Sequence, residues 1–292
     1  MNRGIYSKSS KLYASPHRNL SLRGLYMYCD MHVHSKFSTD SSLDMEAGIL
    51  RAIECGLSGI AFTDHLDIDY VNYEDEFYYD FNEYFYKFNL LRDKYKNKIE
   101  VLSAVEIGFQ PHVIEQTIEK IKDFNFDFII GSTHLIKKRD PYYGSYFKDG
   151  VSKIDAYNEY LAELYSNLKL YSNLKFNTMG HLDYIVRYAN FLDSQFYYND
   201  HADIIDEIFK YIISKNIAFE INTSTYLKQS LDKNLLLRYK ELGGELITIG
   251  SDAHALDRIA KNFRQYLAII KDCGFTYIYH YKNGTPLPEL IK

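Results

Sequence analysis

The stretch CDMHVH at residues 29–34 decides how the rest of this chain is interpreted. It follows an apolar run at residues 25–28, and the two together predict a buried strand that ends in polar side chains. Because side chains alternate along a strand, we expect Asp30, His32 and His34 on one face. Two imidazoles beside a carboxylate suit a metal ion with nitrogen ligands. An isolated H-x-H is more often a pair of surface histidines, so a metal site needs further ligands from the remainder of the chain.

Short apolar runs that lead into polar residues recur along the chain. They lie at residues 59–63, 99–105, 126–131, 176–180, 217–222 and 246–250. Between them, apolar periodicity predicts helices from a start within residues 41–44 to residue 56, over 80–98 and 111–124, from 153 onward, and over 200–214, 232–242 and 257–272. The helix predicted from residue 153 contains the hexapeptide LYSNLK twice in tandem, at 164–169 and 170–175.

Alternating strands and helices indicate a parallel β/α architecture. Barrels of this kind place their active sites at the C-terminal ends of the strands, which is where nearly all the candidate ligands of this chain fall. The sequence therefore predicts an α/β fold with one closed or distorted barrel of seven strands, and residues 277–281 are a candidate eighth strand.

Six of the ten histidines fall at predicted strand ends, together with two acidic residues. The set consists of His32, His34, His65, His134, His181, His254, Glu106 and Asp252. Taken singly, each can be a hydrogen-bonded polar residue at a strand tip. Together at one barrel mouth, they would crowd carboxylates and imidazoles without a counter-charge, which divalent metal ions supply. The sequence therefore predicts a metal centre.

Composition narrows the class of protein. The 292 residues suffice for one large barrel or two ordinary domains. A net charge of −5 gives no basic face for nucleic acid, and no apolar run approaches the roughly 20 residues of a membrane helix. Three unevenly spaced cysteines favour a reducing cytoplasm over a disulfide scaffold.

The first 26 residues are basic and contain no acidic side chain. A transit peptide shares this composition, but the segment has no clean amphipathic period. We expect a disordered extension, or translated sequence ahead of a start at Met27, and assign the barrel domain to residues 27–292.

Six motifs, DMHVH, TDH, VEIG, GSTH, GHLD and SDAH, occur in this order from about Met27 to the end of the chain. Together they resemble the polymerase and histidinol phosphatase (PHP) superfamily. The resemblance implies a distorted (β/α)7 barrel with three divalent ions at the C-terminal ends of its strands. Mixed nitrogen and oxygen ligands accept zinc, manganese or iron.

The resemblance also implies which residues bind each ion. By matched motif, the first ion is held by His32, His34, Glu106 and Asp252, the second by Glu106, His134 and His181, and the third by His65 and His254. Many members supply a further ligand, often histidine, eight residues after the first histidine of the opening motif. Here that position is Asp40, whose carboxylate is a chemically acceptable replacement.

Longer stretches resemble the histidinol-phosphate phosphatase branch: TDHLDIDY at 63–70, DPYY at 140–143, GHLDYIVRY at 180–188 and ELGGELITIGSDAH at 241–254. They imply hydrolysis of a small phosphate monoester, L-histidinol phosphate, in histidine biosynthesis, with a metal-bridging hydroxide as the nucleophile. Two alternatives stay open. One is another phosphoesterase of the superfamily, with a nucleotide, sugar-phosphate or phosphotyrosine substrate. The other is a non-catalytic metal-binding barrel, which the complete ligand set disfavours.

Three further residues are candidates for substrate contact. Arg187 could grip phosphate oxygens through its planar fork, or lie on the surface of a following helix. Asp67 and Asp69 are the acidic residues nearest to His65 in a tyrosine-rich loop, and could hold the cationic end of histidinol phosphate. Most acidic residues of such a loop face solvent. Other polar residues are expected to orient imidazoles or bound water: Asp30, Asp64, Asp183, Glu220 and Asn222.

Overall fold

The computed structural model describes residues 28–71, 77–142, 146–147, 150–224 and 231–292 of the chain. Seven parallel strands follow one another around a barrel: β1 (Cys29–Val33), β2 (Gly59–Phe62), β4 (Glu100–Gly108), β5 (Phe128–Ser132), β6 (Thr178–Met179), β7 (Ala218–Asn222) and β8 (Ile247–Gly250). The segment after β8 returns to β1, where His34 N donates to Ala253 O at 2.9 Å. A two-residue strand, β3 (His65–Leu66), pairs with β4 beside this order. The predicted seven-stranded barrel is confirmed.

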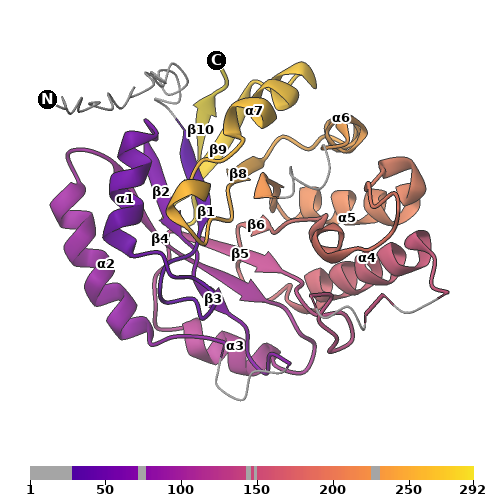
Figure 1. The fold of residues 1–292 in the computed structure, drawn as a ribbon, viewed down its shortest axis with the longest axis horizontal. Coiled ribbons are helices and arrows are strands. Elements are labelled where there is room, and N and C mark those ends of the chain that lie inside the picture. The colour runs from indigo at the N-terminus through magenta and orange to yellow at the C-terminus, as the bar shows by residue number, and fades with distance from the viewer. Residues whose placement is uncertain (1–27, 72–76, 143–145, 148–149, 225–230) are drawn as a thin grey trace, which may run out of the picture.

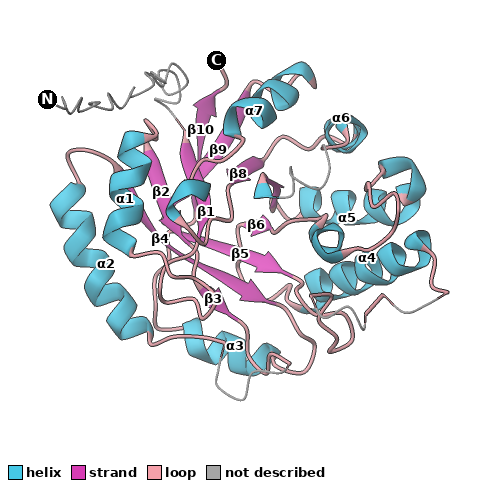
Figure 2. Ribbon diagram, in the orientation of Figure 1, coloured by secondary structure: helices cyan, strands magenta, loops and turns pink. Residues whose placement is uncertain are grey.

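Helices surround the sheet (Figure 2). They are α1 (Met45–Glu54), α2 (Phe81–Tyr95), α3 (Ile114–Ile121), α4 (Lys153–Leu170), α5 (Ala202–Ser214), α6 (Lys233–Glu241) and α7 (Phe263–Asp272). The predicted limits of α1 are confirmed, because Asp44 caps its N-terminus and Gly56 follows its end with φ 74°. The α3 helix begins at Ile114, so the prediction of a start at Pro111 is wrong by about one turn.

Two apolar clusters make up the core. The larger lies between the strands and the surrounding helices. The smaller fills the inside of the barrel with Cys29, Met31, Ala61, Leu102, Ala104, Phe128, Ile130, Ala218 and Tyr281. The face of β4 that contributes Leu102 and Ala104 to this inner core presents Glu106 two residues further on. Along this face of β4, the side chains are therefore apolar inside the barrel and polar at its mouth.

Strand β1 departs from simple alternation. Its register against β2 shifts between Asp30 and Val33, which marks a bulge. Met31 packs in the inner core, and His32 beside it also points into the barrel mouth. The Asp30 carboxylate instead accepts backbone N–H groups of residues 251 and 260, at 2.9 Å each. The prediction that Asp30 shares a face with the two histidines is therefore wrong, because the bulge turns its side chain away from them.

The candidate eighth strand belongs to a separate hairpin. Strand β9 (Tyr277–Lys282) pairs antiparallel with β10 (Thr285–Leu290), which the sequence analysis did not predict. The hairpin lies beside the beginning of β1 (Figure 1), and Tyr281 reaches the inner core. Strand β10 contains Pro286 and Pro288, which suit an edge strand but not a central one.

The tandem hexapeptide adopts two structures. The copy at 164–169 lies within α4, whereas α4 ends at Leu170 and the copy at 170–175 forms the turn that follows it. The prediction of both copies inside one helix is wrong. Within the described part of the chain, no helix is both long enough and apolar enough to span a membrane.

Candidate metal centre

Glu106 occupies the centre of the barrel mouth and is only 1% exposed. Its Oε1 atom lies 2.9 Å from His181 Nε2 and 3.2 Å from His134 Nε2. Its Oε2 atom lies 3.2 Å from both His32 Nε2 and His65 Nδ1 and 3.4 Å from His34 Nε2, and makes no hydrogen bond. One buried carboxylate therefore faces a separate group of imidazoles with each of its oxygens, as a bridging metal ligand does.

The first group of candidate ligands combines this Oε2 atom with three other side chains. His32 Nε2 and His34 Nε2 are 3.0 Å apart, and Asp252 Oδ1 lies 3.5 and 3.3 Å from them. His32 Nδ1 is 2.5 Å from Glu220 Oε1, and because a carboxylate only accepts, the proton is on Nδ1. Nε2 of His32 therefore points into the group and is the nitrogen that would be available to a metal ion.

His34 is oriented by a relay from Asp64. Ser38 Oγ donates to Asp64 Oδ1 at 2.8 Å, so the same oxygen can accept the Nδ1 proton of His34 at 3.0 Å. Asp64 also accepts the backbone N–H groups of Ser35 and Ser38, at 2.6 and 3.1 Å, which fixes the turn after β1. The Nε2 lone pair of His34 is thereby directed at the ligand group.

The second group consists of Glu106 Oε1, His134 Nε2 and His181 Nε2. His134 Nδ1 donates to Asp67 Oδ1 at 2.8 Å, so Nε2, which faces Glu106, is the nitrogen that would be available to a metal ion. Burial alone would lower the pKa of His134, but the carboxylates of Asp67 and Glu106 outweigh it and raise the pKa to about 10. Such strong negative surroundings stabilise any positive charge placed at this position.

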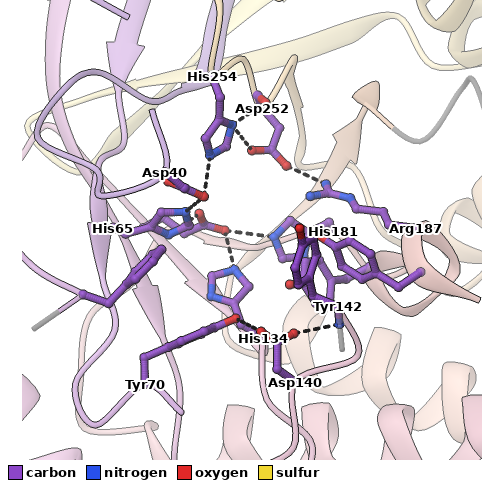
Figure 3. A pocket seen from close by; sticks show the side chains of 14 residues that line it. Asp40, His65, Tyr70, His134, Asp140, Tyr142, His181, Arg187, Asp252 and His254 are labelled. Carbon is purple, nitrogen blue, oxygen red and sulfur yellow. Dashed lines mark hydrogen bonds and ion pairs between the residues drawn. The ribbon is translucent and has the colours of Figure 1, made fainter. Parts of the chain in front are cut away.

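The third group lies at the rim. Asp40 Oδ2 is 3.2 Å from His254 Nε2 and 3.6 Å from His65 Nε2, so Asp40 sits between the two predicted imidazole ligands. Figure 3 shows the three side chains converging at the edge of the cavity. His254 Nδ1 donates to the backbone oxygen of Asp252 at 3.1 Å, which directs its Nε2 toward Asp40.

The buried carboxylates and imidazoles of the centre shift the pKa values of one another. Burial would raise the pKa of Glu106, but His32 and His134 outweigh it and hold the pKa well below its ordinary value. Burial would lower the pKa of His32, but Glu220, Glu106 and Asp252 raise it well above its ordinary value. Buried carboxylates and imidazoles with convergent lone pairs fit divalent ions that accept nitrogen and oxygen ligands.

Asp252 joins the metal-ligand groups to Arg187. The residue adopts φ 52°, a left-handed conformation that is costly outside glycine and is typical of functional sites. Its Oδ2 atom is 2.5 Å from Arg187 Nη2 and accepts from Asn222 Nδ2 at 3.3 Å. Burial would lower the pKa of Arg187, but the Asp252 carboxylate raises it, so the guanidinium stays charged.

Arg187 lies in the 3-10 helix η1 (Tyr184–Tyr188) and lines the cavity rather than the outer surface. The guanidinium lies 5.2 Å from the centre of the Tyr184 ring, within cation–π range. Its Nε atom is buried and makes no hydrogen bond. A charged donor therefore faces the metal-ligand groups with hydrogen-bonding capacity to spare.

A cavity of about 250 Å³ opens over the three groups (Figure 3). One side is an aromatic wall formed by Tyr70, Phe77, Tyr142, Tyr184 and Tyr188. Asp140 stands at this wall and accepts from Tyr70 Oη at 3.0 Å and from Tyr142 N at 2.8 Å. Among the described residues that line the cavity, Asp140 is the carboxylate outside the three ligand groups. Burial raises its pKa, so a nearby cation would stabilise its charged form.

Asp140 and the aromatic wall were not among the site residues predicted from the sequence. Their signal was the DPYY stretch at 140–143, part of which lies outside the described residues. The aromatic residues come from loops and η1, so no strand pattern brings them together.

The structure places Asp67 and Asp69 outside the cavity lining. Asp67 is buried, with Oδ1 on His134 and Oδ2 3.3 Å from His65 Nδ1, so it acts on imidazoles instead of facing substrate. Asp69 is 59% exposed at its side chain and pairs with His112 and Lys138. The prediction that these two carboxylates meet the cationic end of a substrate does not match this geometry. The acidic residues at 74–76 lie outside the described residues.

The class of this protein is that of a barrel of parallel strands with a candidate metal centre of histidines and carboxylates at its mouth. A family model for the PHP domain matches residues 30–224, and the chain belongs to this family.

Several relatives of the chain carry a more specific name than that of the family. The chain is 35% identical over 260 residues to a protein of Clostridium acetobutylicum named probable histidinol-phosphatase, and the match covers 88% of this chain and 98% of that one. It is 32% identical over 249 residues to the histidinol-phosphatase of Lactococcus lactis, with 84% and 91% covered. The crystal structure of the Lactococcus lactis histidinol phosphate phosphatase with zinc, L-histidinol and phosphate superposes with a TM-score of 0.82 at 30% identity, covering 89% of this chain and 99% of that one.

Proposed function

We propose that this protein is a metal-dependent phosphomonoesterase that hydrolyses L-histidinol phosphate to L-histidinol and phosphate in histidine biosynthesis. The observation that carries the proposal is the buried Glu106 carboxylate, which faces two groups of imidazoles across one centre. The fold match to a relative solved with zinc, L-histidinol and phosphate supports the choice of substrate.

Phosphate release from a substrate panel tests this function. We expect the purified protein to hydrolyse L-histidinol phosphate with a higher kcat/KM than nucleotides, sugar phosphates or phosphotyrosine. A nucleotide or sugar phosphate turned over faster than L-histidinol phosphate would contradict the proposal while leaving the family assignment intact.

We propose that the three ligand groups hold up to about three divalent ions, with zinc as the first candidate because the relative binds it. Glu106 would be shared by two ions, and Asp40 would join His65 and His254 at the third. Divalent ions at such a centre lower the pKa of bound water and neutralise phosphate charge. The carboxylates of Glu220 and Asp67 would keep His32 and His134 in the ligating tautomer.

We propose that Arg187 binds the phosphate group. Its Nε atom lacks a hydrogen-bond partner, and its Nη2 atom is held by Asp252, which fixes the plane of the guanidinium at the edge of the ligand groups. A fixed planar donor can pair with two phosphate oxygens at once.

We propose that Asp140 and the aromatic wall bind the other end of the substrate. L-Histidinol phosphate carries an ammonium group and an imidazole beside its phosphate. The Asp140 carboxylate can pair with the cation, and the aromatic rings offer flat apolar surface to the imidazole. This assignment replaces Asp67 and Asp69 as candidates for substrate contact.

Replacing Asp140 by asparagine is expected to lower kcat/KM for L-histidinol phosphate by about 10- to 150-fold, the worth of one charge-assisted hydrogen bond of roughly 1.5–3 kcal/mol. Turnover of p-nitrophenyl phosphate, which carries no cation, should stay within about twofold. Steady-state kinetics on both substrates measure the difference.

Two neighbouring carboxylates provide matched controls. Asp67→Asn should lower turnover of both substrates, by about 10- to 100-fold, because it acts through the orientation of His134. Asp69→Asn should change neither, because its partners lie at the surface. Equal losses on both substrates for Asp140→Asn would place Asp140 with Asp67 as a residue that supports the metal centre.

We propose that the enzyme works in the cytoplasm. The three cysteines, Cys29, Cys55 and Cys273, are buried and free of disulfides, which suits a reducing compartment. Cell fractionation with an antibody against the protein checks the assignment, and enrichment in a membrane or secreted fraction would contradict it.

A further inference from the structure

A second group of metal-ligating side chains lies at the opposite end of the barrel from the candidate active site. It joins Cys29, the first residue of β1, to His280 on β9 and Glu289 on β10. These three residues are separated by up to 260 positions in the sequence. The group therefore exists only because the C-terminal hairpin packs against the start of the barrel (Figure 1).

The hairpin register explains how two of the ligands meet. Glu289 pairs with Ile278 and Leu287 pairs with His280, so His280 and Glu289 are diagonal neighbours on one face of the hairpin. His280 Nδ1 lies 3.1 Å from Glu289 Oε1. The other carboxylate oxygen of Glu289 accepts Cys29 N at 3.2 Å, which holds the hairpin against β1.

The ligand atoms are already close to the spacing that a tetrahedral metal site needs. Cys29 Sγ, one ring nitrogen of His280 and one Glu289 oxygen all lie within 4.8 Å of one another. Zinc–ligand bonds of roughly 2.0–2.3 Å at tetrahedral angles separate ligand atoms by about 3.3–3.8 Å. Small side-chain rotations would therefore close the group around one ion.

Three features distinguish this group from an ordinary buried ion pair. The Nδ1 atom of His280 is buried and makes no hydrogen bond. Its other ring nitrogen, Nε2, lies 3.5 Å from Glu100 Oε2, so a carboxylate stands behind the imidazole as it does behind many metal-bound histidines. Gly59 leaves room for the thiol, because a Cβ atom there would lie 2.4 Å from Cys29 Sγ.

We propose that Cys29, His280 and Glu289 form a zinc site that fastens the C-terminal hairpin to the barrel. A thiolate, an imidazole and a carboxylate together match the ligands of zinc, and the thiolate disfavours magnesium or calcium. Cys29 and Glu289 are almost fully buried, which suits a structural ion that takes no part in turnover. A water would complete the coordination, and Ser58 Oγ, which donates to Glu289 Oε1 at 3.3 Å, would orient that carboxylate.

Cobalt(II) distinguishes this site from the active centre. The ligands assigned to the active centre are nitrogen and oxygen only, so a sulfur-to-cobalt charge-transfer band in the near ultraviolet reports a cysteine ligand. We expect this band in the full-length protein after exchange with cobalt(II). It should be absent in Cys29→Ser and in His280→Gln, and present in Cys55→Ser, which removes a buried thiol outside the group.

Zinc content and thermal stability provide independent readouts. His280→Gln should carry about one zinc ion fewer per chain than the unmodified protein and melt several degrees lower, with kcat/KM for L-histidinol phosphate unchanged within about twofold. His280 lies on the hairpin and is partly exposed, so this variant keeps the test valid if Cys29→Ser does not fold. Cobalt-loaded, catalytically active protein without the charge-transfer band would overturn the proposal, and so would a band that persists in Cys29→Ser.

Discussion

Replacing Glu106 by glutamine is expected to lower kcat/KM for L-histidinol phosphate by about 10³-fold or more. The amide keeps the shape of the side chain but removes the charge that faces both groups of imidazoles. Metal ions supply several kcal/mol of transition-state stabilisation, and each 1.36 kcal/mol is about tenfold in rate. Because one substitution weakens two ligand groups, bound metal should fall together with activity, which elemental analysis of the purified variant measures.

Glu100→Gln is the matched control for this experiment. Glu100 lies on the same strand, at the opposite end of β4, and pairs with Lys282 on the hairpin. The same chemical change there should leave kcat/KM within about twofold. An active Glu106→Gln variant with its full complement of metal would contradict the bridging role of Glu106.

Arg187→Ala is expected to lower kcat/KM by about 10²- to 10⁴-fold, because two charge-assisted hydrogen bonds to phosphate are worth roughly 3–6 kcal/mol. The loss should appear with p-nitrophenyl phosphate as well, since both substrates present the same phosphate. Arg187→Lys should recover only part of the activity, because an ammonium group keeps the charge but lacks the planar fork.

Arg238→Ala separates this effect from the loss of an ordinary ion pair. Arg238 Nη2 lies 2.5 Å from Asp206 Oδ2, the same separation as between Arg187 and Asp252, but the pair joins two outer helices. We expect its removal to change thermal stability slightly and turnover not at all. Unchanged turnover in Arg187→Ala would mean that Arg187 only orients Asp252.

Strand-borne ligands could be predicted from the sequence because an apolar strand of known direction fixes where its C-terminal residue lies. Glu106, His134 and His181 follow this rule, and the parallel sheet brings their strands side by side. The rule gave the wrong direction for the Asp30 side chain. The bulge in β1 depends on how this strand pairs with β2, and the alternation of apolar and polar residues does not reveal it. Asp67 shows a second limit of prediction from the sequence. The sequence places it two residues after His65, but does not show that its side chain turns toward His134.

The tandem hexapeptide shows why local sequence cannot set every helix end. Tyr165 of the first copy packs against Tyr211 on the outside, within a continuous helix. Tyr171 of the second copy is fully buried, stacks on Phe109 at 3.9 Å and donates to Gln110 O at 2.9 Å. These contacts hold Tyr171 against the segment after β4, and α4 ends at the residue before it. Identical residues therefore adopt a helix or a turn according to what packs against them.

The central claim is that turnover of L-histidinol phosphate depends on metal ions held by the groups around Glu106. Phosphate release by the full-length protein before chelation, after removal of metal with a strong chelator, and after addition of zinc, manganese or iron tests it most directly. We expect activity to fall to background on chelation and to return with at least one of these ions, with about one to three ions bound at the groups around Glu106 in addition to any zinc at the C-terminal hairpin. Full activity in protein shown by elemental analysis to be free of metal would contradict the claim.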